Sequence, residues 1–200
     1  MKTTLIIALI FLFGIFFGYI DILPKILLEN DISYYILVLL VFTVGLTIGS
    51  DKRNVRIFKN FQIRILLIPI SAIIGTLLFS ALSSFFLKNY SIKECMAVGA
   101  GFGYYSLSSL ILTQIHSSEL GVIALMSNII RESFTLLFAP LIARMFGKIA
   151  VITSGGATSM DTTLPMVSKY AGKSYVIISV FNGVILTLLV PIIIRIIFWF

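Results

Sequence analysis

Metal-binding and charged residues are scarce in this chain of 200 residues. It contains one cysteine, Cys95, and one histidine, His116, and only 12% of its residues are charged. A single cysteine excludes an intramolecular disulfide, and one histidine leaves no Cys/His cluster for a transition metal. The glycine-rich loop of nucleotide-binding proteins is also missing. We therefore expect no metal and no cofactor, and we expect any energy coupling to come from an ion gradient.

Hydrophobic residues are abundant instead. They make up 59% of the chain, and the mean hydropathy is +1.11. These values exceed the usual range of soluble domains, so the composition predicts an all-α, polytopic membrane protein with a single transmembrane domain over residues 1–200. Fifteen Lys and Arg residues outnumber eight Asp and Glu residues. Because the bases lie mostly in short connections between apolar segments, they indicate orientation in a lipid bilayer and no nucleic-acid partner.

Seven segments approach the roughly 20 residues that a helix needs to cross about 30 Å of hydrocarbon. They cover residues 4–23, 34–49, 65–87, 95–114, 120–143, 149–170 and 175–200. Five are conventional apolar segments. The fourth and the sixth contain glycine and hydroxyl residues, and we predict that both are broken or re-entrant.

The connection 51–64 carries the strongest charge bias, with five basic residues and one acidic residue. The positive-inside rule places this connection, and with it the N-terminus, on the cytoplasmic side of the inner membrane. If all seven segments crossed fully, the C-terminus would lie outside. Lys88, Lys93, Arg144 and Lys148 would then also lie outside, against the same rule.

The two interrupted segments indicate an internal cavity. Gly99, Gly101 and Gly103 alternate in the fourth segment, and each costs about 1 kcal/mol relative to alanine in a helix. The sixth contains Gly155-Gly156 and Pro165. Unwound backbone at membrane depth must be covered by protein or by a water-filled cavity, and transporters place such breaks at their substrate sites. The alternative is close helix packing through small residues.

The fifth segment carries a polar stripe. Asn128, Arg131, Glu132 and Thr135 share one helical face, and Glu132 lies roughly 18 Å into the span at 1.5 Å per residue. A charge at that depth must face the bundle interior, where it is a functional candidate. Two structural alternatives remain: Arg131 forms an ion pair with Glu132 or with Asp161, and Asp161 caps the N-terminus of a half-helix.

Three further residues have weaker signals. Asn182 and Thr187, in the last segment, either line the same cavity or bond to a neighbouring helix. Arg195 is expected to extend to the membrane interface.

Three motifs resemble, in order and spacing, those of the LysO family of bacterial lysine exporters. They span residues 101–108, 128–132 and 154–165, and the similarity extends over essentially the whole chain. The resemblance implies export of L-lysine and of lysine analogues across the cytoplasmic membrane. It also implies a need for membrane-embedded acidic residues, of which Glu132 matches one.

The chain departs from the longer members of this family at its N-terminal side. Those members carry additional N-terminal spans and a second embedded acid that nothing here matches, so the chain resembles their C-terminal portion. Three alternatives follow: a small membrane partner subunit supplies the missing spans, the protein forms a homodimer, or its transport chemistry differs.

A site for lysine needs positive potential for its carboxylate and acceptors for its ammonium groups. We predict that backbone N–H groups and hydroxyls at the two breaks bind the carboxylate, and that Glu132 or Asp161 binds an ammonium and exchanges it for a proton, which gives antiport. The predicted substrate-binding residues are Glu132, Asp161, Arg131, Asn128, Gly101, Gly103, Tyr105, Ser106, Ser108, Gly155, Gly156, Thr158, Ser159 and Thr162.

Alternative functions remain open at this point. The cargo can be another amino acid, an organic anion bound through Arg131, or a cation, and the chain can be a non-catalytic subunit of a larger membrane complex. An intramembrane hydrolase would use Glu132 and Asp161 as acid and base, with Ser154 or Ser159 as nucleophile. That reading lacks a nucleophile–histidine pair, so we expect no enzyme.

Overall fold

The computed structural model describes residues 63–199, together with Phe13, Phe16, Phe17, Tyr35, Leu39, Phe42 and Leu46. The predicted spans 4–23 and 34–49, and most of the basic connection 51–64, lie outside the described residues. Every regular element between residues 63 and 199 is helical. The all-α prediction is therefore confirmed for this part of the chain.

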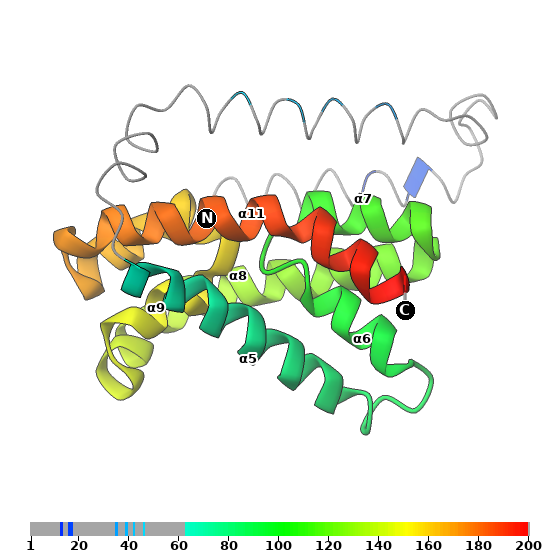
Figure 1. The fold of residues 1–200 in the computed structure, drawn as a ribbon, viewed down its shortest axis with the longest axis horizontal. Helices are drawn as coiled ribbons and strands as arrows, with labels where there is room; N and C mark the ends of the chain where they lie inside the picture. The colour runs from blue at the N-terminus through cyan, green and yellow to red at the C-terminus, as the bar shows by residue number, and fades with distance from the viewer. Residues whose placement is uncertain are drawn as a thin grey trace.

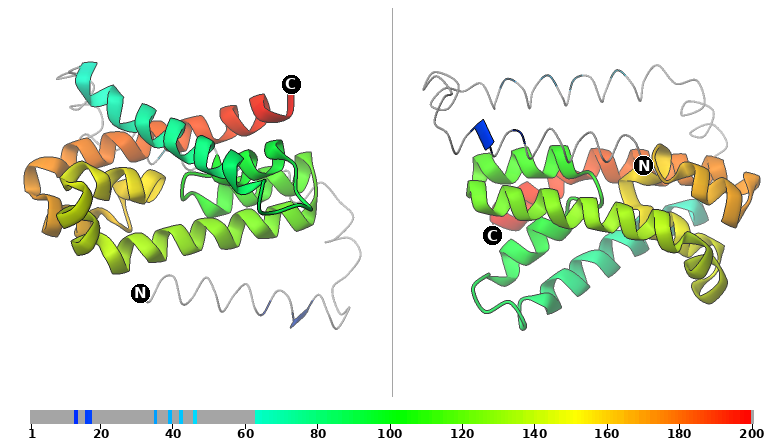
Figure 2. Two further views of the ribbon diagram at one scale, coloured as in Figure 1. Left: turned by 90° about the horizontal axis from the view of Figure 1, so that it is seen from below. Right: turned by 180° about the vertical axis from the view of Figure 1, so that it is seen from behind.

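Three long helices form the frame of the molecule (Figures 1 and 2). They are α5 (Leu67–Ser83), preceded by the 3-10 turn η1 (Ile63–Leu66), α8 (Ser118–Phe146) and α11 (Val176–Trp199). The Ser117 hydroxyl caps the start of α8 by accepting a hydrogen bond from the Leu120 N–H. By length and composition, α8 and the stretch Lys173–Trp199 can each cross a membrane, whereas α5 is an apolar helix of only 17 residues.

Residues 91–116 form a helical hairpin, which we call the first hairpin. It consists of α6 (Ile92–Gly99) and α7 (Tyr105–Ile115). A capping box between Ser91 and Glu94 starts α6. The two ends of the hairpin lie together, because Nε2 of His116 is 3.3 Å from Oε1 of Glu94. The chain therefore turns back at its tip, residues 100–104.

Residues 148–175 form a second hairpin. It begins with α9 (Lys148–Gly155) and turns through the 3-10 segment η2 (Gly156–Met160). It returns through α10 (Leu164–Met166), the π-helical turn η3 (Val167–Ala171) and η4 (Lys173–Tyr175). The Lys148 ammonium lies 5.8 Å from the centre of the Tyr175 ring, which joins the two ends.

The two hairpins enter the molecule from opposite ends and their tips meet. The Ala157 N–H donates a hydrogen bond to the Phe102 carbonyl at 2.8 Å. In Figure 1, α6 and α7 lie toward the end that carries the C-terminus, and α9 lies toward the other end. The fourth and sixth predicted segments therefore each form a hairpin and do not run the length of the bundle. The prediction of about seven transmembrane segments stays a prediction.

The order of elements repeats. A long helix, α5, leads into the first hairpin at one end, and a second long helix, α8, leads into the second hairpin at the other end. Helix α11 then runs back, so that Phe198 near its end stacks on His116 at a ring distance of 5.1 Å. Among the described elements, this arrangement is an inverted repeat of helix and hairpin.

The tip of the first hairpin lies in the main apolar core. Phe102 is fully buried although its φ of +47° lies in the left-handed region. Leu186, Val190 and Ile194 of α11 belong to the same core cluster. The buried side of α11 therefore supports the point where the hairpins meet.

Candidate functional site at the hairpin tips

The contact between the tips depends on a glycine. Gly156 has a φ of +62°, and a Cβ atom there would collide with the Phe102 carbonyl oxygen. Any other residue would both strain this turn and separate the tips. Gly156 was predicted to bind substrate, and its position shows a further reason for a glycine.

Asn128 of α8 holds the tip of the first hairpin. Its side-chain oxygen accepts a hydrogen bond from the Gly103 N–H at 2.7 Å, and its nitrogen donates to the Ala124 carbonyl at 2.8 Å. The Ser108 hydroxyl donates to the Tyr104 carbonyl at 2.9 Å. Asn128 and Ser108 also occupy the space that a side chain at Gly101 would need. These predicted site residues lie together, and Asn128 and Ser108 form hydrogen bonds with backbone groups of the tip.

The tip of the second hairpin is held by α11. The Asn182 side-chain nitrogen donates to the Gly156 carbonyl and to the Ser159 hydroxyl oxygen, both at 3.1 Å. Ser159 and Ser179 each donate from their hydroxyl to the other's carbonyl, at 2.9 and 2.6 Å. Asn182 therefore bonds to the neighbouring hairpin, as one of its two alternatives predicted. Sequence reasoning missed Ser179, because a single serine among apolar residues carries no distinctive signal.

Two more predicted residues belong to this tip. The Thr158 hydroxyl donates to the Gly155 carbonyl at 2.8 Å. Gly155 lies against Thr163, whose hydroxyl oxygen would be 2.5 Å from a Cβ atom at residue 155. Both residues are buried.

Arg131 bonds to backbone carbonyls at the end of α9. Its Nε donates to the Ser154 carbonyl and its Nη2 to the Thr153 carbonyl, both at 3.0 Å. Its Nη1 donates to the Thr76 hydroxyl of α5 at 3.2 Å. Neither ion pair that the sequence suggested, with Glu132 or with Asp161, forms between these described side chains. Arg131 instead joins α5, α8 and α9.

The two acidic residues are close to each other but differ in exposure. Glu132 is 2% exposed, and it interacts with the Thr162 side chain and with the Asp161 carboxylate. Asp161 is exposed and accepts a hydrogen bond from the Thr162 N–H at 2.5 Å. Tyr105 lies near both carboxylates. Glu132, Asp161, Tyr105 and Thr162 therefore form one polar group, which we call the acidic group.

The proposed capping role of Asp161 is wrong. The helical turn that follows, α10, has Thr163 as its N-cap and lacks a side-chain cap hydrogen bond. Asp161 lies two residues earlier and bonds only to the adjacent Thr162 among the described side-chain contacts. Its carboxylate is available for another task.

The start of α7 lies beside the acidic group, because Tyr105 belongs to both. The N-cap residue, Tyr104, makes no side-chain cap hydrogen bond, and Tyr105 and Ser106 are the first residues of the helix. Both are partly buried. A helix N-terminus without a cap offers backbone N–H groups and positive potential to an anion.

The arrangement does not support a serine hydrolase. The Ser154 hydroxyl lies 2.6 Å from the Thr135 hydroxyl, and Ser159 bonds to Ser179. His116 lies at the open end of the first hairpin beside Glu94. Within residues 63–199, neither serine has the histidine that would activate it as a nucleophile.

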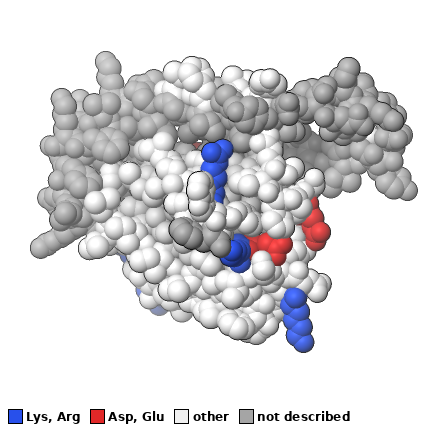
Figure 3. Space-filling model, turned by 45° about the vertical axis from the view of Figure 1, so that its right-hand side comes forward, with Lys and Arg blue, Asp and Glu red and all other residues white. Residues whose placement is uncertain are grey.

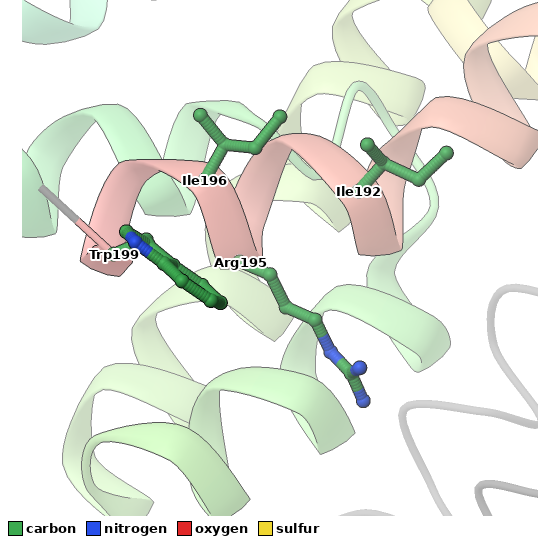
Figure 4. A pocket seen from close by; sticks show the side chains of 4 residues that line it. All are labelled: Ile192, Arg195, Ile196 and Trp199. Carbon is green, nitrogen blue, oxygen red and sulfur yellow. The ribbon is translucent and has the colours of Figure 1, made fainter.

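Two surface hollows lie away from the hairpin tips. A groove of about 390 Å³ on α11 is lined by the side chains shown in Figure 4, among which Arg195 extends away from its helix. A polar pocket of about 360 Å³ lies at the open end of the first hairpin. Its lining residues are Asn89, Tyr90, Glu94, His116, Ser117, Glu119 and Leu120. Charged side chains are otherwise sparse on the face seen in Figure 3.

Comparison with known proteins identifies relatives over most of the chain. The family described as Lysine exporter LysO matches residues 8–198. The chain is 31% identical over 168 residues to "Lysine exporter LysO" of Escherichia coli K12, covering 82% of this chain and 54% of that protein. It is 32% identical over 165 residues to "Putative lysine exporter" of Haemophilus influenzae, covering 81% and 82%. The chain thus spans about half the length of the E. coli relative. No solved structure matches it.

Proposed function

Because this chain belongs to the lysine exporter LysO family, we propose that it exports L-lysine and lysine analogues across the cytoplasmic membrane by proton-coupled antiport. The observation that carries the proposal is the meeting of two broken helical hairpins beside a pair of carboxylates, Glu132 and Asp161. Substrate sites of secondary transporters are built from such discontinuous helices near the bilayer midplane.

In this proposal, α5, α8 and α11 cross the membrane and the two hairpins are re-entrant. Arg144, Lys148, Lys169 and Lys173 lie at the open end of the second hairpin, where α5 also begins, and no described acidic residue lies at that end. The positive-inside rule favours this end as the cytoplasmic one. Arg144 and Lys148 are then cytoplasmic, which removes the conflict for these two residues, whereas Lys88 and Lys93 stay at the opposite end.

The acidic group gives the site its preference for cations. Glu132 and Asp161 provide two carboxylates for the ammonium groups of lysine. The start of α7, which has no side-chain cap, provides the Ser106 N–H for the lysine carboxylate, since the Tyr105 N–H already donates to the Gly103 carbonyl at 3.1 Å. Tyr105 lies between these two regions, since it begins α7 and lies near both carboxylates. The proposed substrate therefore extends from the start of α7 to Glu132.

Proton coupling follows from competition for a carboxylate. A buried carboxylate must be neutralised, and a proton or a lysine ammonium can each do so, but not together. Exchange of one lysine for one proton would be electroneutral and driven by the pH gradient. Arg131 does not supply the neutralising charge, because it is engaged with the carbonyls of α9.

The test is counterflow of labelled L-lysine in proteoliposomes that contain this chain, with and without an imposed pH gradient. We expect the gradient to stimulate uptake, and we expect Glu132→Gln to abolish it. Glu119→Gln is the matched control, because Glu119 lies at the open end of the first hairpin and bonds to Tyr90. Wild-type rates for Glu132→Gln would contradict the site. No lysine movement by folded wild-type protein would contradict transport by this chain alone and would lead to reconstitution with a small membrane partner subunit.

A further inference from the structure

We propose that Arg131 is a positioning residue that holds the two hairpin tips together, and that it does not bind the substrate carboxylate. This inference rests on the proposed function for its effect on transport. Its structural part, the joining of the tips, stands on the hydrogen bonds alone.

The bond between the tips changes the hydrogen bonding of the carbonyls at the end of α9. In a continuing α-helix the Thr153 carbonyl would accept a hydrogen bond from the Ala157 N–H, four residues later. The Ala157 N–H instead donates to the Phe102 carbonyl of the first hairpin at 2.8 Å. The bond between the tips therefore deprives the Thr153 carbonyl of its normal donor.

Arg131 supplies the missing donor. Its Nη2 reaches the Thr153 carbonyl and its Nε reaches the Ser154 carbonyl, both at 3.0 Å. The guanidinium presents several donors in a fixed plane, so one side chain can serve two consecutive carbonyls. A cation at the C-terminal end of a helix also opposes the negative end of the helix dipole. Arg131 thus stabilises the form of α9 in which Ala157 is free to bond to Phe102.

The surrounding contacts fix the guanidinium in this place. Thr76 of α5 accepts from Nη1 at 3.2 Å, and the Ser154 side chain is held by Thr135, one turn beyond Arg131 on α8. A Cβ atom at Gly156 would come within 3.2 Å of Nη2 as well as colliding with Phe102. The turn at Gly156 is therefore built around both the arginine and the opposite tip.

Two states of the tips follow. In one, Arg131 binds the α9 carbonyls and Ala157 bonds to Phe102. In the other, Ala157 returns to Thr153, α9 gains a residue and the tips separate. Removing Arg131 favours the second state, because the Thr153 carbonyl must then find another donor.

The structural test is hydrogen exchange of the folded protein, measured on peptides that cover residues 99–105 and 153–160. We expect Arg131→Gln and Arg131→Lys to accelerate exchange in both peptides together by about tenfold or more, since each hairpin loses its hold on the other. Gly156→Ala keeps the arginine but separates the tips, so it should give the same pattern and serves where an Arg131 variant fails to fold. Arg144→Gln, on the same helix but at its end, is the control and should change neither peptide. Wild-type exchange rates in the folded Arg131 variants overturn the proposal, even where Gly156→Ala accelerates exchange.

The kinetic test separates positioning from substrate binding. We expect Arg131→Lys to lower the maximal rate of lysine counterflow about tenfold or more while the KM changes less than about threefold. L-lysinamide lacks the carboxylate charge, and its inhibition of counterflow should change in the same proportion as the KM for lysine. A KM for lysine that rises alone, with unchanged inhibition by L-lysinamide and unchanged maximal rate, overturns the proposal in favour of a carboxylate ligand. Lysine movement by the wild-type protein tests the proposed function separately.

Discussion

Single residues on one face of α8 have separate tasks. Asn128 accepts a hydrogen bond from the Gly103 N–H at the tip of the first hairpin. Arg131 donates hydrogen bonds to backbone carbonyls at the end of α9, and the Thr135 hydroxyl bonds to the Ser154 hydroxyl. Glu132 alone on this face lies in the acidic group. Three residues of the polar stripe thus bond to the hairpins or to their ends, and Glu132 is the one that the proposed function assigns to the substrate.

Asn128 should be needed for stability because its partner is a buried backbone N–H. Asn128→Ala leaves the Gly103 N–H unpaired, which should cost about 1–3 kcal/mol of unfolding free energy. The neighbouring Ser127 is exposed, and Ser127→Ala should stay within about 0.5 kcal/mol of the wild type. Denaturation of the two variants in detergent micelles measures both effects. Equal stability of the two variants would show that Asn128 does not support the tip.

Glu94, at the start of α6, should make stability depend on pH. Hydrogen bonds from the Ser91 hydroxyl and the Ser91 N–H lower the pKa of Glu94 below its ordinary value of 4.5. Because the pKa is lower in the folded protein, the ionised group stabilises it above the ordinary value, and this contribution is lost as the pH falls through the lowered pKa. The difference in melting temperature between the wild type and Glu94→Gln should therefore shrink on acidification from pH 6 to below pH 4.5. A difference that stays constant would show that the capping box does not act through the charge.

The polar stripe is the part of the site that the sequence predicted best. Its i, i+4 and i+7 spacing placed Asn128, Glu132 and Thr135 on one buried face, and all three are buried. The partners of Arg131 and Asp161 could not be predicted in the same way. Their partners are backbone groups, at the end of α9 and at Thr162, which every residue possesses and which only the broken helix exposes.

At the scale of elements, the hairpins explain why the sequence was ambiguous. Glycines at residues 99–103 and 155–156 predicted that helices end there, and α6 and α9 do end at Gly99 and Gly155. A break in a crossing helix and the tip of a hairpin need the same residue types, because both require backbone that departs from helical geometry. The direction of the chain after the break depends on long-range contacts, such as that between Glu94 and His116.

The hairpin predicts which side of the membrane the flanking residues reach. In a variant without its own cysteine, Cys95→Ala, we expect Lys88→Cys and His116→Cys to react with a membrane-impermeant thiol reagent from the same side, because the first hairpin returns to its starting end. The pair Lys148→Cys and Lys173→Cys should both react from the opposite side, since the second hairpin opens there.

The labelling is measured on intact cells and on inverted vesicles. A full crossing by residues 95–114 would put Lys88 and His116 on opposite sides, and that result would contradict the hairpin.

At the scale of the whole molecule, the inverted repeat was beyond reach of the sequence. The two units, α5 with the first hairpin and α8 with the second, differ in helix length and in most residues: α5 has 17 residues and α8 has 29. The repeat lies in the order and direction of elements, which packing determines. The chain's membership of the LysO family and its helical class were, in contrast, accessible from three motifs and the composition.

The contact between Ala157 and Phe102 has one more consequence. The hairpins enter from opposite ends, and among the described residues one main-chain hydrogen bond, from the Ala157 N–H to the Phe102 carbonyl, joins their tips. Under the proposed function, this contact would separate the two aqueous sides of the membrane, so a variant that parts the tips, such as Gly156→Ala, should let protons leak across proteoliposome membranes as well as transport more slowly.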